Sequence, residues 1–286
     1  MTGPGDAALG PGSWATGSGV VTGTHELVEV VGPEAIPFVQ GLVSQDLALT
    51  DPGTARRSFL LGPRGKLRAL LWVWTEPSKV ALLADAGYGE RVASDLATYR
   101  IRVKAEIAVA TPPVMLLGGG WSPPPGSVSA PLADLARWFA PGSPAEGTHL
   151  TPAAWDRIRI ERGEPVMGRD VDEDTIPQET GLVLEAVSFE KGCYLGQELV
   201  ARIDSRGHVN RRLVRLEFAP GSEPPAAGAA LLREAQEVGR LGTTAAGASG
   251  EPVLGLALVR REVPAGESVE AAGLTATVAD ISGFGS

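Results

Sequence analysis

The chain has 286 residues, with 25 Lys and Arg against 34 Asp and Glu, which gives a formal net charge of −9. Hydrophobic residues make up 43% and charged residues 21% of the composition, which excludes a wholly disordered or fibrous chain and allows a sizeable core. The acidic balance excludes a general attraction to nucleic-acid backbones. One cysteine excludes an intramolecular disulfide, and three scattered histidines provide no zinc-ligand spacing.

The sequence predicts a cytoplasmic protein without a membrane span. The first basic side chain is Arg56, so the N-terminus lacks the positively charged region of a secretory signal. The longest uncharged run, residues 107–133, contains six prolines and is not expected to form a continuous helix. A single cysteine also fits a reducing compartment.

The first part of the chain predicts short helices laid on antiparallel strands. Residues 1–22 are rich in Gly, Ser, Thr and Pro and are expected to form a flexible lead-in. Apolar spacing predicts a helix over 33–43, and the turn in GPRGK, residues 62–66, joins two strands in a hairpin. A helix over 89–98 and a half-buried strand over 99–109 are expected to follow.

The second part predicts two more helices and then a change to short strands. Ser129 is expected to cap a helix that buries Phe139, and Thr151 to cap another that ends at Gly163. Beyond a boundary near residue 210, short β-like runs separated by Pro and Gly turns predict a small barrel or sandwich. The predicted fold class is therefore α+β.

The segment FEKGCYLGQELVAR, residues 189–202, carries the only cysteine. Apolar residues spaced four apart from Leu195 predict a helix that begins near Gly196, which places Cys193 just before its amino end. That position and Lys191, two residues away, both favour a thiolate over a thiol. Cys193 is thus a candidate reactive thiol, although the residues alone leave open that it is a small buried hydrophobe.

KGCYLGQE, residues 191–198, resembles the signature octapeptide of the YgfZ family of folate-binding proteins. The segments EAIPFVQGLVSQDL, RIRIERGEPVMGRD and IPQETGL and a C-terminal β domain follow in the family's order, from about residue 25 to the end. This family is related to the T-protein of the glycine cleavage system, an aminomethyltransferase. The resemblance implies a three-lobed T-protein-like ring of antiparallel sheets and helices, with two intertwined folate-binding lobes over 23–210 and a β-barrel domain over 211–286.

The resemblance also implies a function. The cofactor would be tetrahydrofolate or a derivative, and the partners would be iron–sulfur enzymes or their assembly proteins, including those that modify tRNA. Cys193 would be the functional thiol, assisted by Lys191. One thiol cannot by itself hold a four-iron cluster, which takes about four ligands.

A pterin ring presents hydrogen-bond donors that a carboxylate accepts in a bidentate way. Glu179 in IPQETGL matches the glutamate that related transferases place against folate, and Glu161 is a second candidate. For either residue the alternative is an exposed carboxylate in an acidic stretch. Further residues assigned to the cofactor site, as folate contacts, supports or packing, are Tyr194, Gln197 and Arg202, the last with Arg206, Arg211 and Arg212 for the anionic folate tail.

Two rival functions are a folate-dependent aminomethyl or methyl transferase and an interaction module whose pocket is only structural. In the aminomethyltransferases the segment matching GKLRALLWVW carries an acidic residue, whereas here Arg68 and Ala69 stand at those places. Arginine is not a general base, so an accessory protein is favoured over a transferase. Basic residues over 200–215 and in the 56–68 hairpin allow transient tRNA contact, against which the net charge weighs.

Overall fold

The computed structural model describes residues 17–142, 147–206 and 209–281. They divide into two compact units, each with its own hydrophobic core. The sandwich unit comprises the described residues of 17–149 and 183–202, and the barrel unit those of 150–182 and 203–281. Each unit is therefore assembled from segments that are distant in the sequence.

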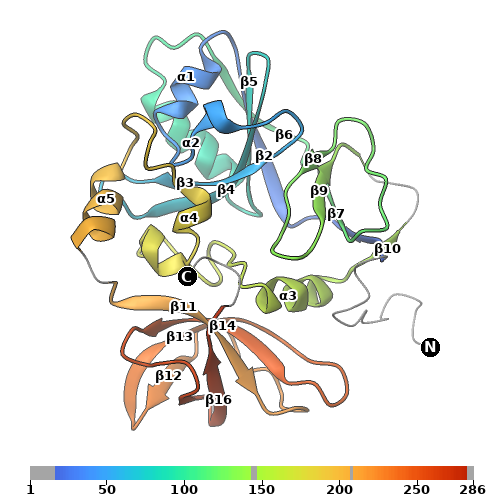
Figure 1. The fold of residues 1–286 in the computed structure, drawn as a ribbon, viewed down its shortest axis with the longest axis vertical. Coiled ribbons are helices and arrows are strands. Elements are labelled where there is room, and N and C mark those ends of the chain that lie inside the picture. The colour runs from blue at the N-terminus through green and yellow to red at the C-terminus, as the bar shows by residue number, and fades with distance from the viewer. Residues whose placement is uncertain (1–16, 143–146, 207–208, 282–286) are drawn as a thin grey trace. The chain divides into compact units, whose positions relative to one another are not determined.

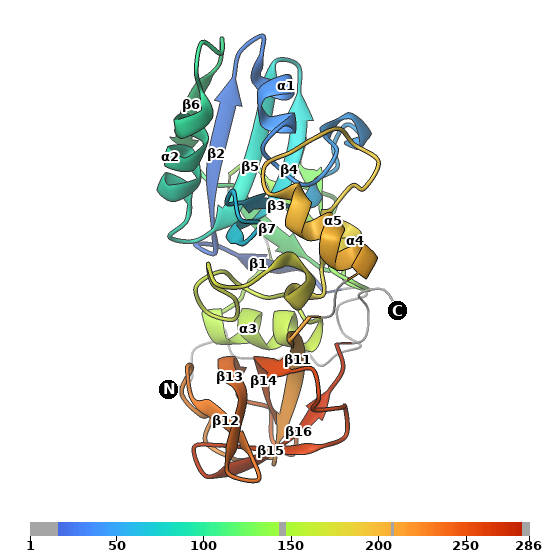
Figure 2. The ribbon, with the colours of Figure 1, turned by 90° about the vertical axis from the view of Figure 1, so that its left-hand side faces the viewer.

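The main sheet of the sandwich unit is antiparallel, with the strand order β3-β4-β5-β2-β6 (Figure 1). Its strands are β2 (His25–Val31), β3 (Arg56–Leu61), β4 (Leu67–Glu76), β5 (Lys79–Asp85) and β6 (Glu106–Ala110). One face packs against helices α1 (Ala35–Gln40) and α2 (Gly89–Tyr99), which can be followed beside the sheet in Figure 2. Val92 and Leu96 of α2 are buried, as their spacing predicted.

A second, smaller sheet has the order β10-β1-β7-β9-β8. Its strands are β1 (Gly19–Val21), β7 (Val114–Leu117), β8 (Val128–Ser129), β9 (Arg137–Ala140) and β10 (Thr148–His149). Strand β1 pairs with both β7 and β10, so the expectation of a flexible lead-in does not hold for residues 19–21. Residues 17, 18 and 22 lie outside any helix or strand, and residues 1–16 of that expectation lie outside the described residues.

The two sheets of the sandwich unit meet at Trp72 of β4. Its ring lies edge-on to Phe139 of β9, with 5.9 Å between the ring centroids. The guanidinium carbons of Arg57, its cross-strand neighbour, and of Arg137 each lie 4.4 Å from the indole centroid. Strand β4 is thus covered on both faces, which explains why its sequence is an almost continuous apolar run.

The helix predicted after Ser129 is wrong. Leu132 and Leu135 exchange two backbone hydrogen bonds, which closes a tight turn with Ala133 at a positive φ of 50°, and the chain then enters β9. The apolar residues are buried as expected, but a turn followed by a strand buries them as well as a helix would. Sheet pairing with β7 decides between the two, which is a tertiary override of local spacing.

The strand predicted over 99–109 is correct only in its second half. Helix α2 continues to Tyr99, and Arg102 adopts a positive φ of 59°, which strand geometry does not allow. Regular pairing with β2 begins at Glu106. The alternation of apolar and charged residues therefore extends further along the chain than the strand itself.

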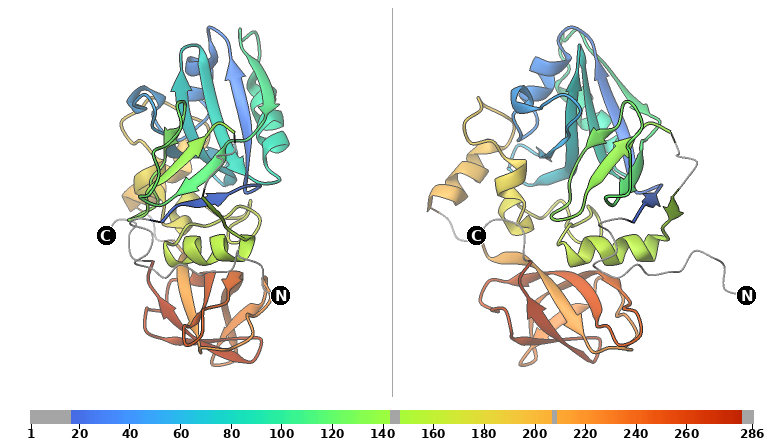
Figure 3. Two further views of the ribbon diagram at one scale, coloured as in Figure 1. Left: turned by 90° about the vertical axis from the view of Figure 1, so that its right-hand side faces the viewer. Right: turned by 45° about the vertical axis from the view of Figure 1, so that its right-hand side comes forward.

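The barrel unit contains a closed antiparallel barrel with the order β11-β14-β13-β12-β15-β16, as expected for the C-terminal region (Figure 3). Its strands are β11 (Arg211–Phe218), β12 (Ala230–Arg233), β13 (Gln236–Ala245), β14 (Val253–Arg260), β15 (Ser268–Ala271) and β16 (Leu274–Ala279). Helix α3 (Pro152–Glu161) packs on β13 and β14. Thr151 caps it by accepting a hydrogen bond from the Ala154 N–H, and Gly163 follows it with a φ of 68°, as predicted.

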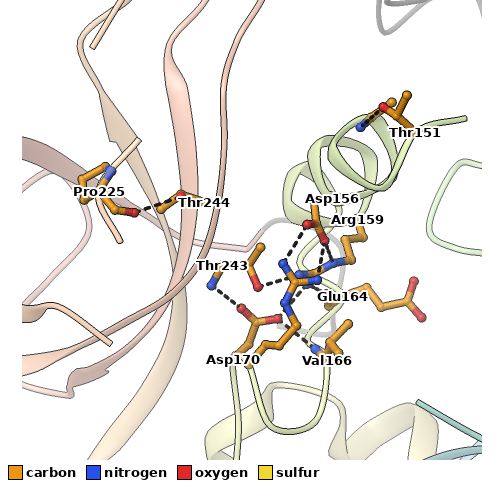
Figure 4. A network of polar contacts seen from close by, with 11 residues as sticks. Thr151, Asp156, Arg159, Glu164, Val166, Asp170, Pro225, Thr243 and Thr244 are labelled. Carbon is orange, nitrogen blue, oxygen red and sulfur yellow. Dashed lines mark hydrogen bonds and ion pairs between the residues drawn. The ribbon is translucent and has the colours of Figure 1, made fainter. Parts of the chain in front are cut away.

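A buried arginine joins α3 to the barrel (Figure 4). The Arg159 side chain is fully buried and donates to Asp156 and Asp170 at 2.7 Å each, and to the Thr243 hydroxyl at 2.6 Å. Asp170 also accepts the Thr243 N–H at 2.7 Å. Two carboxylates thus balance the charge of Arg159, and its donors bind to Asp156 of α3 and to Thr243 of β13.

Four further helical elements complete the described chain. They are η2 (Leu47–Leu49), η3 (Pro177–Thr180), α4 (Val183–Ala186) and α5 (Gln197–Arg206). Of these, η3 lies within IPQETGL and α5 begins within KGCYLGQE. Helix α5 begins one residue after Gly196, close to its predicted start. Among the described residues, every helix is too short or too polar to cross a bilayer.

Candidate functional site

Cys193 is a free, exposed cysteine in the loop that precedes α5. The alternative that it is a small buried hydrophobe is therefore wrong. The loop follows α4 and contains the sequence KGCYLG, and the chain turns into α5 at Gly196, whose φ is 80°. The thiol is thus accessible to solvent on the loop that leads into α5.

Lys191 is the first residue of this KGCYLG loop, and its ammonium group is hydrogen-bonded to three backbone carbonyls. Its Nζ donates to the backbone carbonyls of Gln40 and Val43 at 2.7 Å each and to that of Gln45 at 2.8 Å. Burial lowers the pKa of Lys191 to about 8, and the charge of Asp46 acts in the opposite direction. Because an ammonium has three protons, its donor capacity is used by these three carbonyls.

Further hydrogen bonds join the same two segments. The Leu195 N–H donates to the Gly41 carbonyl at 3.1 Å, and the Ser188 N–H to the Ser44 carbonyl at 3.0 Å. The Ser44 hydroxyl donates to the Ala186 carbonyl at 2.6 Å. The segments QGLVSQ, residues 40–45, and 185–196 therefore form one hydrogen-bonded assembly, although they are far apart in the sequence.

Tyr194 and Gln197 support the loop from within. Tyr194 is buried, and this burial raises the pKa of its hydroxyl to about 12. The Gln197 Oε1 accepts the Tyr194 N–H at 3.1 Å across the turn at Gly196. A Cβ on Gly196 would lie 2.7 Å from the Gly62 carbonyl oxygen, so the GPRGK hairpin turn packs directly against the start of α5. Both side chains thus hold the turn that precedes α5.

Glu179 is buried in η3 of the barrel unit. Arg211 donates to it in a bidentate way, Nε to Oε1 at 2.8 Å and Nη2 to Oε2 at 2.9 Å. Oε2 also accepts the Ile176 N–H at 3.1 Å. The hydrogen bond that Arg211 donates to Glu179 raises the pKa of Arg211. The carboxylate is therefore fixed in place, and within the described part of the chain Oε1 accepts only from Arg211 Nε.

Glu179 lines a pocket of about 880 Å³ in the barrel unit. This volume lies within the range of small-molecule sites, about 300 to 1,000 Å³. Its charged lining residues are Glu179, Arg211, Glu237, Arg240, Arg260 and Glu262. Glu161 is not among the lining residues and instead forms an ion pair with Arg157 one helical turn away, at 2.8 Å.

The predicted site residues thus fall into two groups. Cys193, Lys191, Tyr194, Gln197 and the exposed Arg202 belong to the sandwich unit, whereas Glu179 and Glu161 belong to the barrel unit. Sequence reasoning did not find the carbonyls that receive Lys191, because a backbone acceptor leaves no mark in a single sequence. It also missed Arg211 as the partner of Glu179, although this arginine was noted for its charge.

Five arginines of the basic stretches considered for tRNA form ion pairs. Arg68 donates to both carboxylate oxygens of Asp95 at 2.8 Å, and Arg57 is buried with Glu185 at 3.1 Å. Within 200–215, Arg211 binds Glu179, Arg212 binds Asp280 and Arg215 binds Glu217. These cations therefore offer little free positive charge for phosphate groups.

Comparison with known proteins shows which proteins have sequences similar to this chain. The family model described as the CAF17 C-terminal beta-barrel domain matches residues 210–283. The iron-sulfur cluster assembly factor IBA57, mitochondrial, of Homo sapiens is 29% identical over 82% of this chain and 75% of its own length. The tRNA-modifying protein YgfZ of Sodalis glossinidius is 26% identical over 71% of each chain. The chain is therefore similar to a YgfZ protein and to IBA57 over more than two thirds of their lengths.

Other relatives are matched over less of their own length. The chain covers 31% of a chloroplastic protein of Arabidopsis thaliana and 55% of an IBA57 homolog of Pyricularia oryzae. Among solved structures, the glycine cleavage system aminomethyltransferase T from Bartonella henselae has a TM-score of 0.76 at 20% identity, covering 94% of this chain and 86% of that chain. The chain therefore has a T-protein-like fold, as the resemblance of its motifs implied.

Proposed function

We propose that this chain is a tetrahydrofolate-binding accessory protein for iron–sulfur proteins, and through them for tRNA modification, with Cys193 as its functional thiol. The observation that carries the proposal is the exposure of the only cysteine, within the family signature and on a loop held by Lys191 and the 40–45 segment. Its relatives bear the names of an iron–sulfur cluster assembly factor and a tRNA-modifying protein.

The barrel-unit pocket supports the folate part of the proposal. Oε1 of Glu179 receives one donor, and a carboxylate oxygen has two lone pairs, so it can still accept from the amide or amine edge of a pterin. Arg211 fixes the plane of the carboxylate before any ligand arrives. Bound tetrahydrofolate would supply a carrier for one-carbon units. The lining cations suited by charge to its anionic tail are Arg240 and Arg260, which in this structure pair with Asp172 and Glu262.

An accessory role fits this chain better than aminomethyl transfer. The place at which the transferases carry an acid holds Arg68, whose guanidinium is paired with Asp95 of α2. A guanidinium cannot take a proton from an amine at neutral pH. Purified protein given tetrahydrofolate and a methylamine donor is expected to form no methylene-tetrahydrofolate, and turnover would favour the transferase.

The test of the thiol is Cys193→Ala compared with Cys193→Ser in cells that lack the native protein. We expect both variants to bind tetrahydrofolate with unchanged affinity by isothermal titration, since the pocket residues belong to the other unit. We expect both to lose support of iron–sulfur enzyme activity, because neither side chain supplies a thiolate. Full activity of either variant would remove the thiol from the proposal.

Isothermal titration of the native protein with tetrahydrofolate, together with a pulldown, tests the remaining alternative of an interaction module. An interaction module with a structural pocket would bind no folate in its native form yet would still recover a partner by pulldown. A single exposed cysteine is compatible with the reducing cytoplasm, where we expect the protein to work.

A further inference from the structure

The three carbonyls around Lys191 form a site of their own. Gln40 ends α1, and Val43 and Gln45 lie in the loop that follows it. Their oxygens converge on one Nζ at distances of 2.7, 2.7 and 2.8 Å, which are those of strong charge-assisted hydrogen bonds. The ring of Tyr194 lies 5.3 Å from the same nitrogen and adds a cation–π contact.

This geometry favours an ammonium over a guanidinium. An ammonium directs three protons along diverging axes from a compact centre, whereas a guanidinium holds its donors in a planar fork. Three carbonyls that face one nitrogen match the three protons of an ammonium and do not match the planar donors of a guanidinium. Lys191 belongs to the signature segment, and its ammonium group therefore binds that segment to the backbone carbonyls of residues 40–45.

We propose that Lys191 is a positioning residue, and that its ammonium occupies a three-carbonyl site which holds the Cys193 loop on the 40–45 segment. It acts on the thiol through the backbone rather than as a neighbouring charge that activates it. This inference rests on the proposed function only in taking Cys193 as the functional thiol. The ammonium site itself requires neither folate nor a client protein.

Two variants test the site by hydrogen–deuterium exchange of residues 40–47 and 186–196. In Lys191→Ala the carbonyls lose charged hydrogen bonds, so we expect amide exchange in both segments to rise by at least ~10-fold. Lys104→Ala, which removes an exposed lysine from the same unit, is the matched control and is expected to leave both segments unchanged. Ammonium chloride is expected to restore slow exchange in Lys191→Ala, whereas sodium chloride at the same ionic strength is not.

The reactivity of the Cys193 thiol distinguishes a Lys191 that positions the loop from a Lys191 that activates the thiol by its charge. Because Cys193 is the only cysteine, the pH profile of iodoacetamide alkylation reports its apparent pKa alone. We expect Lys191→Ala to shift this pKa by less than ~0.3 units and Lys191→Arg, which keeps the charge, to show the fast exchange of Lys191→Ala. A rise of about one unit with unchanged exchange, or full rescue by arginine, would overturn the proposal.

A measurement on the native protein does not depend on whether the variants fold. A caged ammonium exchanges its protons slowly with water, so the Lys191 ammonium should give a protected signal in a nitrogen-15 spectrum at neutral pH, with correlations to the backbone carbonyls. Absence of that signal from folded protein would contradict the ammonium site and would leave the role of Cys193 to be judged separately.

Discussion

At the scale of single residues, the decisive contact in the barrel unit is the bidentate pair of Glu179 and Arg211. Glu179→Gln replaces one oxygen by an amide nitrogen, which cannot accept from Arg211. We expect a loss of about 2 kcal/mol in the free energy of unfolding, the value typical of a charged hydrogen bond. If this carboxylate also contacts the pterin, the affinity for tetrahydrofolate should fall by ~10-fold or more.

Urea unfolding and isothermal titration measure the two effects independently. Glu161→Gln is the matched control because Glu161 pairs with Arg157 one helical turn away and lies outside the pocket lining, so its stability loss should be about 0.5 kcal/mol or less. Unchanged folate affinity in Glu179→Gln, together with the expected loss of stability, would reduce Glu179 to a purely structural residue.

At the scale of elements, the attachment of α3 to the barrel depends on one buried arginine. Arg159→Met would leave the carboxylates of Asp156 and Asp170 without their buried partner. Breaking a buried pair in this way costs about 3 to 5 kcal/mol, so we expect a large shift of the urea midpoint. Arg169→Met removes a cation that also binds Asp156 but is half exposed, and its cost should be below about 1 kcal/mol. Equal effects of the two substitutions would contradict this account.

The elements also indicate how far the sequence could predict the fold. Helix α3, the GPRGK hairpin and the start of α5 were predictable because caps, turn residues and apolar spacing act over a few neighbouring residues. The strand at Arg137–Ala140 was not, because pairing with β7 overrides a spacing that fits a helix. Pairing of residues 40–45 with 185–196 joins positions more than 140 apart, for which one sequence carries no signal.

The candidate site likewise has features that the sequence predicted and features that it could not predict. Apolar spacing placed Cys193 just before a helix but left its exposure open, and the family motifs indicated Glu179. The engagement of Lys191 by three carbonyls and of Glu179 by Arg211 depends on tertiary contacts between distant segments. Residue type therefore indicated which groups carry the chemistry, whereas the structure supplied the partners that fix their orientation.

At the scale of the whole molecule, charge decides between direct and indirect action on tRNA. The net charge is −9, and the arginines of the two basic stretches are mostly engaged with carboxylates. A protein that neutralises six to ten phosphates loses about 10³- to 10⁵-fold in affinity between 50 and 200 mM salt. Among the described side chains of those stretches, five arginines pair with carboxylates, so we expect direct binding of tRNA to be weak.

Filter binding of labelled tRNA at 50 and 200 mM potassium chloride tests this expectation. We expect no retention below about 100 μM protein at either salt concentration, since electrostatic binding without specific contacts already reaches 10⁻⁴ to 10⁻⁶ M in proteins built for it. Arg202→Ala is a suitable second protein, because it removes an exposed arginine of α5 and should change nothing if that arginine meets no phosphate. Micromolar binding of the native chain with a steep salt slope, abolished by Arg202→Ala, would instead establish direct contact and make tRNA itself a partner.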